Sequence, residues 1–322
     1  MSKTLVQVKD LKKTFEVKKG FMGKKQSLRA VDGVSFEIKE GETLSLVGES
    51  GCGKSTTGRL LLKLLQPTEG QIFIDDVDVT KYTDNQMRPL RKDMQMIFQD
   101  PYSSLNPRIK IKDLISEPLQ VHTQMSKEER YKKVAELLEI VGLDQDHMEK
   151  YPHEFSGGQR QRIGIARAIS VHPKLLVADE PVSALDVSIQ SQVLNLMQDL
   201  QKEMGLAYLF ISHDLSVVEH ISTRVCVMYL GRIVETATRD EMYSTPLHPY
   251  TKALLSAVPV ADPELKKERI LLQGDIPSPV NPPSGCNFHT RCPECRDICS
   301  REIPKSVDVG NGHLVSCHLY SN

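Results

Sequence analysis

The chain has 322 residues, 39% of them hydrophobic and 26% charged, which suits one large domain with an appendage, or two domains. Its formal net charge of −1 provides no basic field of the kind that nucleic-acid-binding domains carry. The sequence contains neither a targeting peptide nor an apolar run near the ~20 residues that a membrane span needs. We therefore expect a cytosolic protein, which would need partner chains for any work at a membrane.

Short apolar segments in the first part of the chain predict mainly strands. The expected strands are Leu5–Val8, Val34–Ile38, Thr43–Val47 and Gln71–Ile74. From about residue 110 to 172 the apolar spacing becomes helical, and Ser126 and Glu129 form a capping-box pattern at the start of one helix.

The second half predicts a parallel core followed by an irregular tail. Residues 175–178 and 207–211 are apolar runs typical of buried parallel strands, and an amphipathic helix separates them. A hairpin is expected from Arg224 to Glu235, turning near Gly231. Beyond Pro246, proline and cysteine become frequent, which favours irregular structure.

A nine-residue segment, Gly48 to Thr56, fits the phosphate-binding pattern G-x-x-x-x-G-K-[ST]; we call it the P-loop. It follows the strand at 43–47 and precedes an expected helix over residues 58–65, which is the context that the motif requires. The backbone N–H groups of such a loop cradle phosphates, so the segment predicts nucleoside triphosphate binding rather than a glycine-rich turn. Lys54 would reach the outer phosphates and Ser55 would bind Mg²⁺. The expected binding residues here are Gly48, Ser50, Gly51, Gly53, Lys54, Ser55 and Thr56.

Two carboxylates follow the apolar run 175–178. Asp179 stands at the carboxyl end of the expected strand, where it can hold Mg²⁺ directly or through water. Glu180 is one residue farther on, placed to polarise an attacking water. In isolation this would read as a strand with a charged turn, but it follows a P-loop.

A second phosphate-binding device lies between these motifs, at Ser156-Gly157-Gly158-Gln159. Ser156 can cap a helix whose first turn exposes N–H groups and a positive dipole end. Because one P-loop already serves one nucleotide, the second device suggests a site assembled from two subunits.

The motifs in this order resemble the ATP-binding subunits of ATP-binding cassette (ABC) transporters, over roughly residues 5–245. The resemblance implies an α/β fold, an ABC-type P-loop nucleotide-binding domain with a mixed core sheet, an antiparallel β subdomain and a helical subdomain at about 100–172. This domain would span residues 1–245. A small irregular Cys-rich extension would follow over residues 246–322.

The resemblance also implies roles for residues outside the P-loop. Gln99 would sense Mg²⁺ and the transmembrane partner, His213 would contact the γ-phosphate, and Asp186 would lie at a dimer seam. Phe15 matches the adenine-stacking aromatic, although core packing is a rival explanation. The implied Mg²⁺ ligands are Ser55, Gln99 and Asp179, and the implied catalytic residues are Glu180, His213, Lys54 and Gln99.

Further motifs at Pro101–Pro107, Tyr151–Ser156, Pro246–Thr251 and Arg291–Pro293 make nearly the whole chain similar to ATPases of bacterial oligopeptide/dipeptide importers. That similarity implies ATP hydrolysis coupled to peptide uptake, peripherally on the cytoplasmic face of the membrane. The implied partners are a second ATPase subunit (identical or paralogous), two transmembrane permeases and, indirectly, an extracytoplasmic peptide-binding protein, without nucleic acid.

Other functions stay open at this point. Related members import nickel or glutathione, or serve antimicrobial-peptide systems. A soluble ABC ATPase acting on DNA or ribosomes is disfavoured by the single cassette and the balanced charge, and a non-hydrolysing regulatory subunit is disfavoured by Glu180.

Five of the seven cysteines crowd the last part of the chain, at positions Cys286, Cys292, Cys295, Cys299 and Cys317. In a reducing cytosol such a group suggests a metal site before it suggests disulfides. Cys286, Cys292, Cys299 and Cys317 supply four thiolates, enough for an iron–sulfur cluster or a structural zinc, and their spacing does not choose between these and no metal. Importer ATPases with this tail carry [4Fe–4S] clusters, so the resemblance implies such a cluster with Cys295 as the spare thiol.

Overall fold

The computed structural model describes residues 3–18, 25–258 and 268–321. These residues form two compact units, each built from separated stretches of the chain. Unit 1 comprises Met1–Thr4, Ile38–Thr43 and Lys81–Ile211, and unit 2 comprises Leu5–Glu37, Leu44–Thr80 and Ser212–Asn322. Across the described ranges, no helix has the length and apolar character needed to cross a membrane.

Unit 1 is built around parallel strands in the order β8–β7–β6. The strands are β6 (Met94–Ile97), β7 (Leu175–Asp179) and β8 (Ala207–Ser212). Every residue of β7 and β8 is buried, which fits strands covered on both faces and explains their unbroken apolar runs. In register, Ile97 pairs with Ala178, and Asp179 pairs with Ile211, so the ends of neighbouring strands lie side by side.

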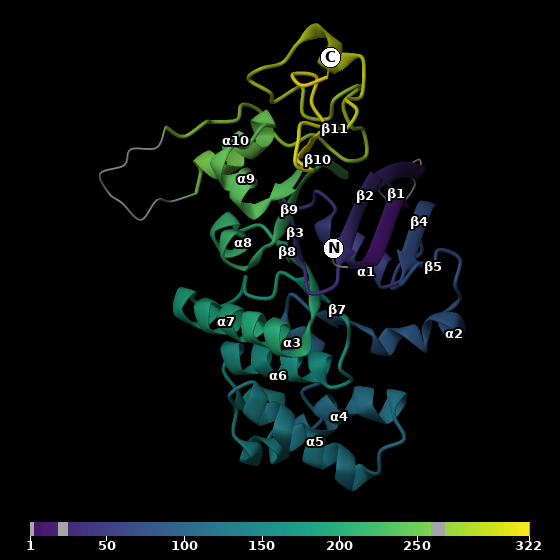
Figure 1. Ribbon diagram of the computed structural model, residues 1–322, viewed down its shortest axis with the longest axis vertical. Helices are drawn as coiled ribbons and strands as arrows, with labels where there is room; N and C mark the ends of the chain where they lie inside the picture. The colour runs from purple at the N-terminus through teal and green to yellow at the C-terminus, as the bar shows by residue number, and fades with distance from the viewer. Residues whose placement is uncertain (1–2, 19–24, 259–267, 322) are drawn as a thin grey trace. The chain divides into compact units, whose positions relative to one another are not determined.

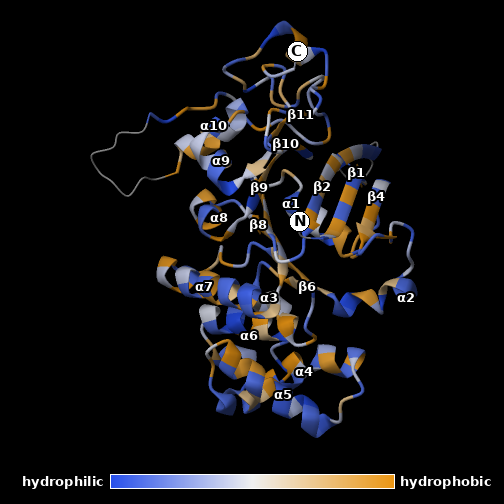
Figure 2. Ribbon diagram, in the orientation of Figure 1, coloured by the Kyte–Doolittle hydropathy of each residue, from blue (hydrophilic) through white to orange (hydrophobic). Residues whose placement is uncertain are grey.

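The rest of unit 1 is helical. Its helices are α2 (Asp84–Met87), α3 (Pro101–Ser104), α4 (Ile111–His122), α5 (Lys127–Ile140), α6 (Gly157–Ile169) and α7 (Val187–Met204), with short 3₁₀ turns η1 (Leu90–Lys92), η2 (Gln145–Glu149) and η3 (Pro152–Glu154). Helix α4 packs on α5 and α6, and α6 packs on α7 and β6 (Figure 1). Blue and orange alternate along α4 and α5, as expected for helices with one face in a core (Figure 2). The capping box predicted at Ser126 and Glu129 is present at the start of α5.

Unit 2 contains an antiparallel group of strands in the order β2–β1–β4–β5 (Figure 1). These are β1 (Thr4–Lys18), β2 (Lys25–Lys39), β4 (Glu69–Ile74) and β5 (Val77–Asp78). The strands predicted at 5–8, 34–38 and 71–74 all lie inside them, and β1 and β2 extend well beyond the predicted segments.

A second group of strands in unit 2 carries the P-loop and receives the end of the chain. Its order is β11–β12–β10–β9–β3. The strands are β3 (Thr43–Val47), β9 (Arg224–Tyr229), β10 (Arg232–Thr238), β11 (Val307–Asp308) and β12 (Leu314–Val315). The helices are α1 (Lys54–Leu61), α8 (Leu215–Ile221), α9 (Arg239–Ser244) and α10 (Pro249–Ser256), with the 3₁₀ turn η4 (Asp297–Ser300).

The hairpin predicted around Gly231 is confirmed, with β9 and β10 antiparallel and Gly231 at φ 80°. The C-terminal extension is less irregular than predicted. Its strand β12 pairs with β10 through Val315 opposite Glu235, so the extension continues the strand group that contains β3, β9 and β10.

The helix after the P-loop differs from the prediction over 58–65, because α1 runs from Lys54 to Leu61. Gly53, at φ 109°, is its N-cap, so the P-loop lysine is the first helical residue. At the other end Lys63 adopts the left-handed conformation at φ 54°, which stops the helix although leucines continue in the sequence. The loop backbone therefore sets these boundaries, and apolar periodicity does not.

Candidate functional site

Two glycines of the P-loop are required by close backbone approaches. A Cβ on Gly48 would lie 2.2 Å from the Met228 carbonyl oxygen on β9. A Cβ on Gly53 would lie 2.1 Å from the Ala30 carbonyl oxygen on β2. Both residues have positive φ as well, 150° and 109°. Because any side chain would collide with backbone there, the loop can sit this close to its neighbouring strands only with glycine.

Lys54 lies inside the loop that it follows. It is 4% exposed, and its Nζ donates to the carbonyl oxygens of Gly48 at 2.8 Å and Glu49 at 3.1 Å. These bonds curl the loop around the ammonium group, at the start of α1 where the helix dipole adds positive potential. Cys52 is also buried, and burial raises the pKa of its thiol, which favours a packing role.

Two residues of the C-terminal extension contact the P-loop, and the sequence did not predict either contact. The Tyr250 hydroxyl accepts from the Glu49 N–H at 3.0 Å, and the Arg291 guanidinium donates to both oxygens of the Glu49 carboxylate at 2.8 and 3.2 Å. Both residues stand in motifs that the sequence singles out, 246–251 and 291–293. The two motifs were the only sign in the sequence that Tyr250 and Arg291 matter. Neighbouring residues do not indicate that either side chain contacts the P-loop.

In unit 1, the two carboxylates at the end of β7 have different surroundings. Asp179 is 1% exposed. Glu180 has φ 48°, a conformation that is strained for a residue with a side chain, and its N–H donates to the Ile211 carbonyl at 2.9 Å. Its Oε2 accepts from Gln99 Nε2 at 2.8 Å, so the structure brings these two predicted catalytic residues together.

The segment Ser156–Gln159 opens α6 as predicted. Ser156 is the N-cap, its Oγ accepts from the Gln159 N–H at 3.3 Å, and Gln159 Oε1 accepts from the Ser156 N–H at 3.0 Å. A Cβ on Gly158 would lie 2.4 Å from Cγ2 of Ile189 on α7, whereas one on Gly157 would only touch Leu185 at 3.6 Å. Gly158 is therefore also required for the close packing of α6 on α7.

The other predicted residues occupy separate local settings. Asp186 is the N-cap of α7, where bonds from the Ile189 N–H and the Ser188 hydroxyl lower the pKa of its carboxyl. His213 is exposed and lies directly after β8. Phe15 is half-buried in β1 with the Lys13 ammonium 5.1 Å from its ring centroid, so it is not a core residue.

The predicted residues are thus divided between the units. Unit 1 carries Gln99, Ser156, Gly157, Gly158, Gln159, Asp179, Glu180 and Asp186. Unit 2 carries Phe15, the P-loop with Gly48, Ser50, Gly51, Gly53, Lys54, Ser55 and Thr56, His213 and the C-terminal cysteines.

The predicted metal site at the C-terminal cysteines is not supported. All seven cysteines are free, and within the described ranges no group of three or more His, Cys, Asp or Glu side chains is arranged to hold a metal ion. Burial raises the pKa of Cys286 to about 11 and that of Cys292 to about 12. The described residues therefore show neither a [4Fe–4S] cluster site nor a zinc site.

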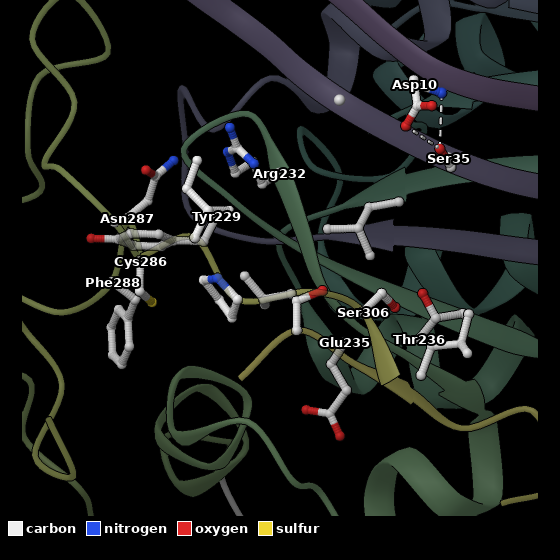
Figure 3. A pocket seen from close by; sticks show the side chains of 18 residues that line it. Asp10, Ser35, Tyr229, Arg232, Glu235, Thr236, Cys286, Asn287, Phe288 and Ser306 are labelled. Carbon is white, nitrogen blue, oxygen red and sulfur yellow. Dashed lines mark hydrogen bonds between the residues drawn. The ribbon is translucent and has the colours of Figure 1, made fainter. Parts of the chain in front are cut away.

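A cavity of about 310 Å³ in unit 2 lies between β10 and the C-terminal segment around Cys286–Phe288 (Figure 3). Its charged residues already have partners. Arg232 donates to Asp32 at 2.7 Å. Glu235 accepts from the Leu247 and His248 N–H groups and lies 2.8 Å from His313 Nε2. The contacts of Glu235 join the extension to β10, and the pair of Arg232 with Asp32 joins β10 to β2, so both groups of contacts are structural.

Two protein families match parts of the chain. Residues 31–183 match the family described as ABC transporter, and residues 234–299 match the oligopeptide/dipeptide transporter, C-terminal region. The chain is 55% identical to the oligopeptide transport ATP-binding protein AppF of Bacillus subtilis, over 99% of this chain and 98% of that protein. It is 51% identical to the dipeptide transport ATP-binding protein DppF of Escherichia coli, over 98% of this chain and 95% of that protein.

Solved structures include a similar one, the dimeric post-hydrolysis state of the ATP-binding cassette MJ0796 bound to ADP and Pi. It is 30% identical with a TM-score of 0.66, and the match covers 73% of this chain and 99% of that one.

Proposed function

The chain belongs to the ABC transporter family, among the ATP-binding proteins of oligopeptide and dipeptide transport, and on that premise we propose that it hydrolyses ATP to drive uptake of short peptides. The observation that carries the proposal is the P-loop itself. A buried strand, a loop with two obligatory glycines and a helix that begins at a buried lysine form a phosphate-binding device.

The residues that we propose as Mg²⁺ ligands suit that ion chemically. The Ser55 hydroxyl, the Asp179 carboxylate and the Gln99 amide oxygen are hard donors of the kind that Mg²⁺ prefers. When bound, Mg²⁺ would neutralise charge on the β- and γ-phosphates. We assign phosphate binding to Lys54 and the loop N–H groups, orientation of the attacking water to Glu180, and contact with the γ-phosphate to His213. Phe15 is assigned to the adenine.

The chain would act as part of a larger assembly. We propose residues 1–245 as the nucleotide-binding domain and 246–322 as its extension. Ser156–Gln159 and Asp186 would face a second ATPase subunit, in keeping with the dimeric state of the cassette MJ0796. Two transmembrane permeases and an extracytoplasmic peptide-binding protein would complete the importer, with this chain peripheral on the cytoplasmic face.

A metal site at Cys286, Cys292, Cys299 and Cys317 is retained as a separate hypothesis. Its support is the gathering of these thiols in one short segment, where the Cys286 N–H donates to the Cys299 carbonyl at 2.8 Å. Binding would require the thiols to move together and lose their protons. About four irons per chain after anaerobic purification would support a [4Fe–4S] cluster and one zinc would support a structural zinc. Finding neither iron nor zinc in the purified protein would reject the metal site.

Reconstitution with the permeases tests the function. We expect labelled dipeptide to enter vesicles only with ATP present, and Lys54→Ala to remove both nucleotide binding and uptake, because the outer phosphates lose their cation. ATP-dependent uptake of nickel or glutathione without peptide uptake would keep the ATPase role and reject the peptide. ATP hydrolysis that requires no permease would argue against a transporter.

A further inference from the structure

Glu49 is the residue through which the C-terminal extension holds the P-loop. It is the second residue of the loop, and its carbonyl oxygen accepts from Lys54 Nζ at 3.1 Å. Its N–H donates to Tyr250, and its carboxylate accepts both bonds from Arg291, as described above. One residue therefore connects the phosphate-binding lysine to two side chains that are 201 and 242 positions away in the sequence.

The pair between Arg291 and Glu49 is protected from water. Their side chains are 8% and 25% exposed, and the two parallel N–H···O bonds fix the guanidinium against the carboxylate. The carboxylate raises the pKa of Arg291, so the pair keeps its charge. Exposed ion pairs contribute little, but a bidentate pair at this burial can hold a loop in one conformation.

The residues next to this contact are buried and closely packed. Phe288, whose carbonyl accepts from the Arg291 N–H at 3.0 Å, is 1% exposed. Its ring packs edge-on against Tyr229 with 5.2 Å between centroids and lies 5.4 Å from Tyr250. Tyr250 is fully buried, and Tyr229 is the last residue of β9, beside the Met228 carbonyl on which Gly48 rests. Both side chains that reach Glu49 therefore arise from one aromatic cluster beneath the loop.

We propose that Arg291 is a positioning residue for nucleotide binding, which acts through Glu49 to keep the P-loop in its phosphate-binding conformation. Together with Tyr250, it makes the C-terminal extension part of the nucleotide site. The inference rests on the proposed ATP-binding function and adds a determinant of affinity outside all of the nucleotide motifs. Arg291 immediately precedes Cys292, so changes in the cysteine segment would reach the loop through the same side chain.

The expected change in MgATP affinity follows from the fraction of molecules whose P-loop is in the phosphate-binding conformation. If removal of the pair leaves about one loop in ten correctly folded at any time, the apparent dissociation constant for MgATP rises about tenfold. The turnover number of the assembled transporter at saturating MgATP should stay within about twofold, because Arg291 touches neither the phosphates nor the water.

The test measures MgATP binding to the full-length chain by calorimetry, together with the melting temperature. Arg291→Gln and Glu49→Gln should each raise the dissociation constant about tenfold, and the double variant should do no worse than either. Arg291→Lys keeps the charge but loses the bidentate geometry, and should give a smaller rise of about threefold. Arg296→Gln is the matched control, an exposed arginine of the same segment, and should bind like the wild type.

The outcomes separate the two proposals. A wild-type chain that does not bind MgATP would reject the proposed function. A wild type that binds, with Arg291→Gln and Arg291→Lys folded, binding equally well and only melting earlier, would overturn the inference and leave Arg291 as a structural contact. If Arg291→Gln does not fold, the test uses Arg291→Lys instead. A dissociation constant and a KM for MgATP about threefold above the wild type would support the inference, and unchanged values would overturn it.

Discussion

Glu180 combines three features that make it the strongest candidate for the catalytic base. It follows the buried Asp179, it occupies a strained backbone conformation at φ 48°, and its carboxylate accepts from Gln99. Strain at a single residue persists only where the surrounding structure enforces it, here through the bond from its N–H to the Ile211 carbonyl. The bond from Gln99 aims the carboxylate, which we propose orients the attacking water.

We expect Glu180→Gln to retain MgATP binding and to lower ATP turnover by at least about 100-fold, because an amide cannot accept the proton of the attacking water. Steady-state hydrolysis by the assembled transporter measures this, with Glu203→Gln, an exposed change on α7, as the control. Turnover within a few-fold of the wild type would rule out Glu180 as the base.

At the scale of elements, helix α6 packs on α7 and, in our proposal, also contacts a nucleotide, so one substitution in it can affect both roles. Its N-terminal turn exposes the capped end that we assign to a partner's nucleotide, while Gly158 lets it approach α7. A loss of activity at Gly158 would therefore not by itself prove contact with nucleotide. Separating the two requires variants that restore the packing.

Gly158→Ala should lower the free energy of unfolding by about 1–3 kcal/mol, because its Cβ collides with Ile189. Ile189→Ala in the same chain should recover part of that loss. Gly164→Ala, at an open position of the same helix, should be neutral or stabilise by up to about 1 kcal/mol. Chemical denaturation measures all three. ATP turnover that recovers along with stability would show that Gly158 only packs.

The N-cap residue of helix α10, His248, should make the stability of the fold depend on pH. His248 is 1% exposed, its Nδ1 accepts from the Tyr250 N–H at 3.1 Å, and burial lowers its pKa to about 3, with a smaller contribution from Lys252. The unfolded chain, with a histidine pKa near ~6.5, binds the proton first as the pH falls. The stabilising contribution is therefore complete above about pH 6.5 and is lost progressively between about pH 6.5 and 3.

As the pH falls from 7 to 5, preferential protonation of His248 in the unfolded chain should lower the free energy of unfolding by about 2 kcal/mol. His248→Asn keeps a side-chain acceptor for the cap but cannot bind a proton, so its stability should fall less over that range. His153→Asn, at an exposed position, is the control. Equal pH slopes for wild type and His248→Asn, by denaturation at each pH, would contradict the assignment.

At the scale of the whole molecule, one chain carries two helix N-termini that we propose to bind phosphate, at the P-loop with α1 and at the capped start of α6. A single nucleotide needs one. Both helix ends would be used if each subunit of a dimer placed the start of its α6 at the nucleotide of the other subunit, as a dimeric cassette would allow. Hydrolysis would then depend on assembly as well as on the residues of this chain.

A cysteine at Ser156 should cross-link to one placed in the P-loop of the partner subunit when ATP is bound and Glu180→Gln blocks turnover. The exposed Cys295 should first be replaced by Ser, which removes the most accessible native thiol. Gel analysis under non-reducing conditions reports the product. Cross-linking confined to a single chain would contradict exchange between subunits.

The nucleotide-binding motifs could be recognised from short stretches of the sequence alone. The P-loop, the carboxylates at 179–180 and the cap at Ser156 depend on residue type over a few neighbouring positions, and local geometry follows from local composition. Most strands were predicted for the same reason, because their apolar runs are continuous. The start of α1 was missed, since a left-handed glycine and not periodicity defines it.

The contacts between distant segments could be found only from the folded chain. Three features depend on residues that lie far apart in the sequence or on the surrounding fold. They are the pairing of Arg291 with Glu49, the close approach that excludes a side chain at Gly158, and the backbone strain at Glu180. For the cysteines, their number suggested a metal site, whereas the part of the chain that the structure describes contains no group of side chains arranged to hold a metal ion. Which side chains meet depends on how whole strands and helices pack, and one-dimensional spacing does not contain that information.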